Sequence, residues 1–274
     1  MTPSTVIDEF ISTTSPCILG RALNAFEMKN ASESVANSES IQRGVPFRFE
    51  RDMLQPLACG VYDALGLQSD RLQILREPMF GGVIPDLLIG IVPDDFTVAV
   101  CHNDFPQGLV DSFLVHFLTD CGTSEIAELQ EQLGLNATST ARSLKKLHHA
   151  GLVDWTYADT AVATRFAEQV LDIEIIAIEA KLTRWREALE QATAYKTFCD
   201  RAFVAMDANQ FVLTPDCEKN FTENRVGLIV CDGDRIEQLI HAPSGNERNP
   251  QRARAALRVA ASCTGLRVGR SWCE

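Results

Sequence analysis

Two apolar segments of the sequence carry charged residues whose types suit metal-assisted chemistry. Asp86 lies inside the strand-like stretch Gly82–Val92, and Glu179 and Lys181 close a second one, Asp172–Lys181. Residues i and i+2 of a strand point to the same side of a sheet, so Glu179 and Lys181 share one face. Charged groups at the ends of buried strands are costly unless they are paired or bind something.

The chemistry that these side chains offer is the binding of a hard cation beside an oriented water molecule. Mg²⁺ prefers one or two carboxylates together with water and phosphate oxygens. If the two strands are neighbours, Asp86 and Glu179 would supply such a site for Mg²⁺ (or Mn²⁺). Lys181 at the same site can orient a water molecule and favour its deprotonated form.

The sequences Pro85-Asp86 and Glu179-Ala180-Lys181 resemble the motif of the PD-(D/E)XK nuclease superfamily, which has the restriction-endonuclease-like fold. The resemblance implies that Asp86 and Glu179 hold the metal ion, aided by the main-chain carbonyl of Ala180. It also implies that Lys181 positions the attacking water. The fold that it implies is an α/β, restriction-endonuclease-like mixed sheet flanked by helices.

Two further features extend this resemblance. Gln191 and Tyr195 match the QxxxY spacing of one branch of the superfamily, and four residues apart on a helix they lie on one face. The resemblance implies that they contact the DNA backbone near the metal. The family also often has a glutamate on its first helix, and the resemblance implies that it joins the metal site; Glu50 is the best placed candidate and Glu77 the alternative.

The elements that must position these residues divide the chain into three parts. Residues 1–45 have the pattern of a helical lead-in and a polar linker, while 46–106 and 167–274 would form one discontinuous nuclease-like core. The gap between Asp86 and Glu179 is far longer than a hairpin allows, so an inserted domain must return the chain to the same sheet. Residues 107–166 are the predicted insertion.

The insertion has the pattern of a winged helix-turn-helix domain. Asn136 can cap a helix over 137–150, and a small hairpin is predicted after it. This helix carries Arg142, Lys145 and Lys146 without any acidic residue, whereas the preceding helix is acidic. That segregation favours a recognition helix that faces DNA phosphates.

Composition limits the classes of protein that fit. The chain has 274 residues, 46% of them hydrophobic, and a formal net charge of −12, which argues against a nucleic-acid coat protein. It has no apolar run long enough for a transmembrane helix, and no basic segment precedes an apolar run at the N-terminus. Its nine cysteines form no CxxC pair, so we expect no zinc ribbon. Because the cysteines are scattered and the sequence has no transmembrane segment, we expect a cytoplasmic location and no membrane association.

The function that we expect is a magnesium-dependent DNA nuclease, an (endo)deoxyribonuclease that hydrolyses phosphodiester bonds. The winged helix would position duplex DNA rather than a single strand, in a bacterial or phage defence or mobile-element context. A homodimer, and a partner protein of a defence system, are both compatible with the sequence. The alternative is a catalytically silent DNA-binding or regulatory protein on a nuclease-like scaffold. The sequence leaves open DNA versus RNA, endo- versus exonucleolytic cleavage, and the oligomeric state.

Overall fold

The computed structural model describes residues 45–80, 82–96, 105–156, 159–233, 235–245 and 248–263, all of which belong to one compact unit. The helical lead-in and linker predicted at residues 1–45 lie outside the described residues, except for residue 45. The segment Thr97–Cys101, whose short apolar run predicts a strand, also lies outside them.

A six-stranded mixed sheet forms the centre of this unit, with the strand order β1-β2-β6-β7-β8-β9. The strands β6, β7 and β8 run parallel, and the pairs at either side of them are antiparallel. Its strands are β1 (Leu72–Arg76), β2 (Leu87–Ile91), β6 (Glu174–Lys181), β7 (Arg201–Asp207), β8 (Gly227–Asp232) and β9 (Arg235–Ile240). The central strands β6 and β7 are buried at almost every position because both faces of the sheet are covered.

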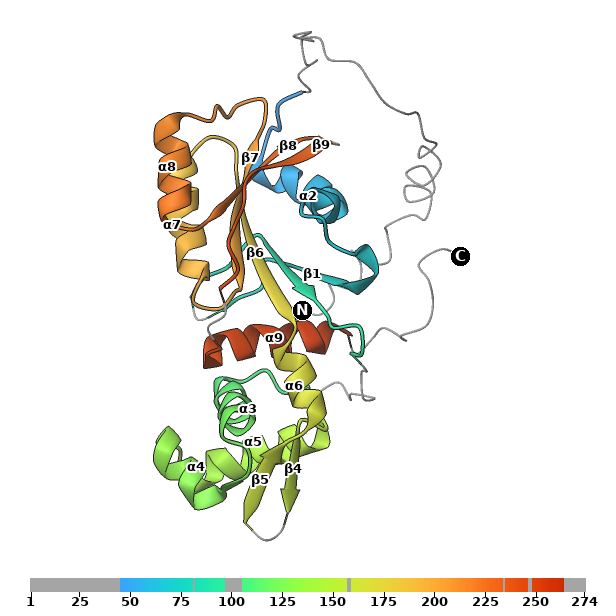
Figure 1. Ribbon diagram of the computed structural model, residues 1–274, viewed down its shortest axis with the longest axis vertical. Coiled ribbons are helices and arrows are strands. Elements are labelled where there is room, and N and C mark those ends of the chain that lie inside the picture. The colour runs from blue at the N-terminus through green and yellow to red at the C-terminus, as the bar shows by residue number, and fades with distance from the viewer. Residues whose placement is uncertain are drawn as a thin grey trace. The chain divides into compact units, whose positions relative to one another are not determined.

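Helices cover both faces of the sheet (Figure 1). Along β6, Ile176 and Ile178 belong to a buried cluster with α2, whereas Ile175 and Ala177 belong to a second cluster with α7, α8 and α9. This alternation is the period of a strand with two buried sides. The helices are α2 (Glu50–Ala64), α7 (Trp185–Tyr195), α8 (Pro215–Glu223) and α9 (Pro250–Cys263), with a short 3-10 helix η2 (Ser69–Arg71). The expected mixed α/β architecture, a mixed sheet flanked by helices, is confirmed.

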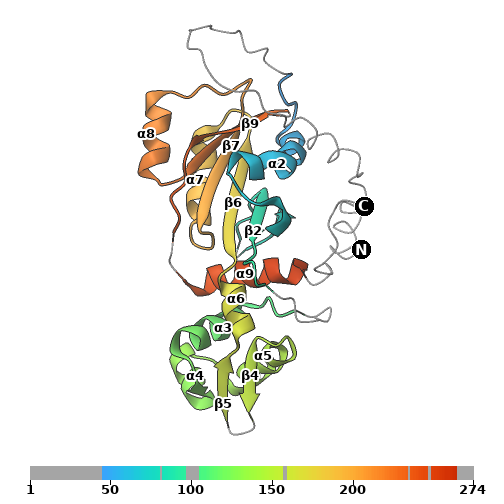
Figure 2. The same cartoon turned by 45° about the vertical axis from the view of Figure 1, so that its right-hand side comes forward.

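Between β2 and β6 the chain forms a separate group of elements (Figure 2). They are α3 (Leu109–Cys121), β3 (Ser124–Glu125), α4 (Ile126–Leu133), α5 (Ala137–His149), β4 (Val153–Thr156), β5 (Thr160–Ala163) and α6 (Arg165–Leu171). The three strands form a small antiparallel sheet in the order β3-β5-β4. As predicted, the Asn136 side chain caps α5 by accepting a hydrogen bond from the Ser139 N–H at 2.9 Å.

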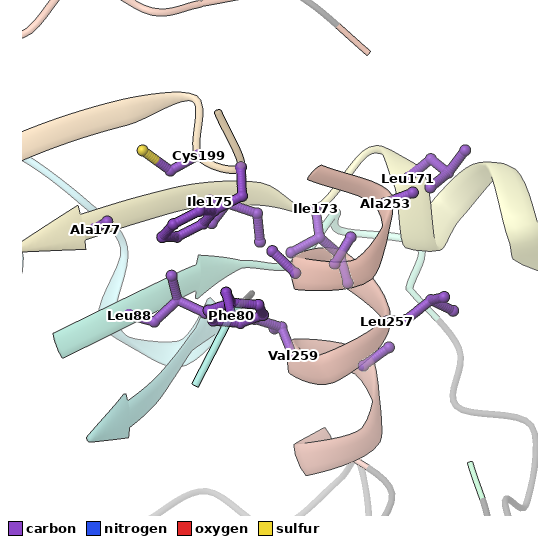
Figure 3. Packing of buried hydrophobic residues seen from close by; sticks show 14 of the residues in the cluster. Phe80, Leu88, Leu171, Ile173, Ile175, Ala177, Cys199, Ala253, Leu257 and Val259 are labelled. Carbon is purple, nitrogen blue, oxygen red and sulfur yellow. The ribbon is translucent and has the colours of Figure 1, made fainter. Parts of the chain in front are cut away.

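Helix α9 joins this group to the large sheet. Figure 3 shows Val259 of α9 beside Phe80 and Leu88, on the face of the sheet opposite to α2. The approach is so close that a Cβ atom on Gly90 of β2 would lie 2.2 Å from a methyl carbon of Val259. Only glycine fits at this crossing. The same buried cluster continues into α3 and α5 through Leu118 and Leu144.

A buried ion pair fixes the other half of α9. The Arg252 guanidinium donates from Nε to Asp200 Oδ1 at 2.7 Å and from Nη2 to Asp200 Oδ2 at 2.9 Å. It also donates to the carbonyl oxygens of Leu171 and Ile173. Since these residues lie at the end of α6 and before β6 and β7, Arg252 ties α9 to the point where the chain re-enters the sheet.

Candidate active site

The register between β2 and β6 brings Asp86 to the predicted motif. Leu87 pairs with Ile178 in an antiparallel ladder, so continuing the ladder by one residue sets Asp86 opposite Glu179. Asp86 Oδ2 accepts a hydrogen bond from the Ala180 N–H at 2.7 Å, although the two residues are 94 positions apart in the chain. Side chains that are directly opposite in such a pair share one face of the sheet. The structure therefore brings the two carboxylates together.

Glu179 is held by a donor at each carboxylate oxygen. The residue is 3% exposed, and its Oε1 accepts a hydrogen bond from Lys181 Nζ at 2.7 Å. Its Oε2 accepts a hydrogen bond from the Tyr195 hydroxyl, which also lies 3.2 Å from the carbonyl oxygen of Ile84. Burial and the contact with Glu179 raise the pKa of Tyr195, so the hydroxyl keeps its proton and stays a donor.

Lys181 lies between acidic residues from two elements. Its Nζ is 2.7 Å from Glu179 Oε1 and 3.4 Å from Oε2 of Glu50, at the first turn of α2. Burial lowers the pKa of Lys181, but the bond to Glu179 and the charges of Glu50 and Asp86 outweigh burial and raise it. The side chain is therefore an ammonium that can orient a water molecule, not a neutral amine that could take a proton from one.

Asp86 is the carboxylate of the site whose pKa is raised. Burial raises its pKa from 3.8 to about 6, aided by the nearby Glu179 charge, while the bond from the Ala180 N–H and the Lys181 charge oppose the rise. Its second oxygen, Oδ1, has no hydrogen bond within the described part of the chain. Three carboxylates, with that of Glu50, thus share one ammonium, and the excess negative charge favours a bound cation.

Asp86 and Glu179 are the residues that could hold a metal ion. In the described ranges, no three His, Cys, Asp or Glu side chains form a group placed to hold one. Two carboxylates are nevertheless the donor number that Mg²⁺ usually takes from a protein, with water and phosphate oxygens completing the shell. The Ala180 side chain belongs to the cluster on the opposite face, so only its main chain lies at this site.

Of the two alternative glutamates, Glu50 has its side chain at the site. Glu77 is exposed and contributes its backbone N–H, which donates to the carbonyl oxygen of Asp86 at 3.0 Å. Its φ of +46° marks the point where β1 ends.

The pair Gln191 and Tyr195 is divided by burial. Tyr195 is 2% exposed and its hydroxyl donates to Glu179, whereas Gln191, one turn earlier on α7, is exposed. Both were expected to contact DNA from their spacing, and the bond from Tyr195 to Glu179 was not foreseen. A tyrosine on the helix that directly follows the motif strand was the signal available for it.

The basic residues of α5 lie where they were expected. Arg142, Lys145 and Lys146 are all exposed, while Leu144 and Leu147 form the buried side of the same helix. The exposed side of α4 carries the acidic residues Glu128 and Glu131, with Glu125 just before the helix.

Comparisons of the chain with protein-family models, with curated proteins and with solved structures found no match. Among the described residues, no helix has both the length and the apolar character that crossing a bilayer requires.

Proposed function

We propose that this protein is a metal-dependent nuclease of the PD-(D/E)XK type that hydrolyses phosphodiester bonds in DNA. The observation that carries the proposal is the pairing of Asp86 with Glu179 across β2 and β6, with the Lys181 ammonium bound to the same carboxylate. Three residues that the motif requires are thereby adjacent, although they come from distant parts of the sequence.

The order of the elements supports the same proposal. Helix α7 follows the motif strand β6 and leads to the strand β7, and this helix–strand order is the one that the resemblance implies. The group α3–α5 with its three short strands supports an inserted winged helix-turn-helix domain, with α5 as its recognition helix.

Each residue of the site has a role in this proposal. Asp86 and Glu179 would hold Mg²⁺ or Mn²⁺, which when bound polarises the phosphate and offsets the charge that develops on it. Lys181 orients the attacking water molecule, and Glu50 holds the Lys181 ammonium from the side of α2. Tyr195 is a positioning residue, because it fixes one oxygen of Glu179 and so the direction of the other.

Helix α5 supplies the contact with the substrate. Arg142, Lys145 and Lys146 form an exposed basic face on a chain whose net charge is −12. Contacts of this kind fix the duplex in place through its phosphates, and the carboxylate site then performs the chemistry.

A cleavage assay tests the proposal. Supercoiled, linear and single-stranded DNA are incubated with the wild-type protein in Mg²⁺, in Mn²⁺ and in EDTA, beside the variants Asp86→Asn and Lys181→Met. We expect cleavage by the wild type that needs the metal and falls at least about a hundredfold in either variant. Cleavage that survives both substitutions would contradict the proposal. Salt-dependent DNA binding without any cleavage would instead favour the catalytically silent DNA-binding protein.

A further inference from the structure

Three exposed side chains beside the candidate active site have no part in the chemistry described so far. Arg48, Phe49 and Arg51 lie on either side of Glu50, at the start of α2. The guanidinium carbon of Arg48 is 5.1 Å from the centroid of the Phe49 ring, and that of Arg51 is 4.8 Å from it. We call these residues the Arg48–Phe49–Arg51 cluster.

The cluster is adjacent to the carboxylates of the site. Glu50, whose Oε2 lies 3.4 Å from Lys181 Nζ, is the chain neighbour of both Phe49 and Arg51. Consecutive Cα atoms are about 3.8 Å apart, so the ring and the Arg51 guanidinium begin one residue away from a side chain of the site.

Hydrogen bonds fix the backbone that carries the cluster. The Phe47 N–H donates to Oδ2 of the fully buried Asp207 at 3.0 Å, and Gln210 donates to the Phe47 carbonyl at 3.3 Å. The Phe49 N–H donates to Asp52 Oδ2 at 3.0 Å. A backbone held in this way loses little conformational freedom when its side chains bind a ligand.

The side chains of the cluster are open to solvent. Phe49 is 44% exposed and the Arg51 side chain is 75% exposed. The nearest carboxylate oxygen to Arg51, on Asp52, is 3.9 Å from Nε, and the other oxygen of Asp52 already accepts the Phe49 N–H. Arginine 51 is therefore able to bind an external anion.

The chemistry of the cluster matches a nucleotide. Guanidinium groups bind phosphates through paired N–H donors, and an exposed aromatic ring offers a surface on which a base can stack. Two positive charges at the edge of a site with three carboxylates also reduce the repulsion that a polyanion meets there.

We infer that the Arg48–Phe49–Arg51 cluster binds an unpaired nucleotide of the substrate strand next to the bond that is cut. The ring of Phe49 stacks on the base, and Arg48 and Arg51 hold the flanking phosphates. Bases inside a duplex are stacked on one another and are out of reach of such a ring. The cluster therefore directs cleavage to positions where a duplex has an unpaired nucleotide or ends in a single strand. This inference rests on the proposed nuclease function.

The test compares binding and cleavage of two DNA probes, a labelled duplex with a single-stranded tail and the same duplex without the tail. Binding is measured in Ca²⁺ and cleavage in Mg²⁺. We expect Phe49→Ala to weaken binding of the tailed probe about tenfold and to change binding of the blunt probe less than twofold. Arg48→Ala/Arg51→Ala should weaken binding of the tailed probe and reduce its salt dependence, and Phe49→Trp should retain wild-type binding.

Two control variants match these substitutions. Leu109→Ala removes an apolar side chain that is 45% exposed at the start of α3, and Arg165→Ala removes an arginine that is 80% exposed. Both should behave as the wild type. If Phe49→Ala binds and cuts the tailed probe as well as the wild type does, the inference is wrong while the nuclease function stands. If the wild type neither binds nor cuts either probe, the proposed function is wrong, and the inference falls with it.

Discussion

Replacing Asp86 by asparagine should stabilise the metal-free protein while it removes the proposed activity. Burial and the neighbouring Glu179 charge raise the pKa of Asp86 to about 6, so the ionised side chain is less favourable in the folded protein than in water. Asparagine has nearly the same shape, and its carbonyl oxygen can still accept the hydrogen bond from the Ala180 N–H. The substitution removes the charge and keeps the contact.

The sign and size of the effect follow from linkage. The pKa of Asp86 is higher in the folded state than its ordinary value of 3.8, so the folded protein binds this proton more tightly than the unfolded chain does. Stability from this group is therefore present below about pH 4 and is lost as the pH rises through about 6. A difference between 3.8 and about 6 corresponds to at most about 3 kcal/mol, and partial exposure of Asp86 reduces it to about 1–3 kcal/mol.

Urea unfolding in EDTA measures this difference. At pH 8 we expect Asp86→Asn to be more stable than the wild type by about 1–3 kcal/mol, and at pH 5 by about half as much. Asp154→Asn, which changes an exposed aspartate on β4, should shift stability by less than about 0.5 kcal/mol at either pH. An Asp86→Asn protein that is equal to or less stable than the wild type at pH 8 would refute the account of Asp86 as a destabilised carboxylate.

Three further predictions test other parts of the molecule. Arg252→Ala should lower the free energy of unfolding by about 3–5 kcal/mol because it leaves a buried carboxylate unpaired, whereas Arg248→Ala, which breaks an exposed pair, should cost less than about 1 kcal/mol; equal losses in urea unfolding would contradict this. Lys145→Ala/Lys146→Ala should reduce the slope of log affinity against log salt for duplex DNA by about 2, and an unchanged slope in a binding titration would count against α5 as the DNA-binding helix. Tyr195→Phe should lower kcat about tenfold at saturating Mg²⁺ and shift the metal concentration that gives half-maximal cleavage. The free energy of unfolding of this variant should be about 1–3 kcal/mol lower than that of the wild type. Cleavage by the variant at the wild-type rate would exclude a positioning role.

Local signals in the sequence predicted the elements whose ends depend on single residues. The sequence predicts a cap at Asn136, a helix end at Gly134 and a hairpin around Gly233. In the structure Asn136 caps α5, Gly134 follows α4 with a φ of +62°, and Gly233 follows β8 with a φ of +58°. These positions have backbone conformations or side-chain hydrogen bonds that few residue types supply, so the residue type at each position is enough to indicate them.

Elements that depend on distant partners were predicted less well. The strands expected at 71–80 and 82–92 are shorter in the structure, because the chain turns between them and the ladder holds only Leu72–Arg76 against Leu87–Ile91. The sequence predicts a helix over 124–133 with Thr123 as its cap, but Ser124–Glu125 pairs with β5 and the helix begins at Ile126. Helix α8 was missed, although Thr214 and Pro215 form a common helix start.

In the candidate site, too, local features were predicted from the sequence and features that depend on distant partners were not. Residue types and strand alternation were enough to select Asp86, Glu179 and Lys181. The register of β2 against β6 depends on pairing across 94 positions, and the inward direction of Tyr195 depends on how α7 packs against β6. Neither is encoded in a short window of sequence, so the link between Tyr195 and Glu179 could not be derived from spacing alone.

The proposed nuclease function depends on the binding of a divalent ion by Asp86 and Glu179 together. Electron paramagnetic resonance of Mn²⁺ measures this directly in the wild type and in Glu179→Gln, with unfolding curves to show that both proteins are folded. We predict that the wild type immobilises Mn²⁺, that Mg²⁺ displaces it, and that Glu179→Gln binds at least about tenfold more weakly. Equal Mn²⁺ binding by both proteins, or none by the wild type, would contradict the account.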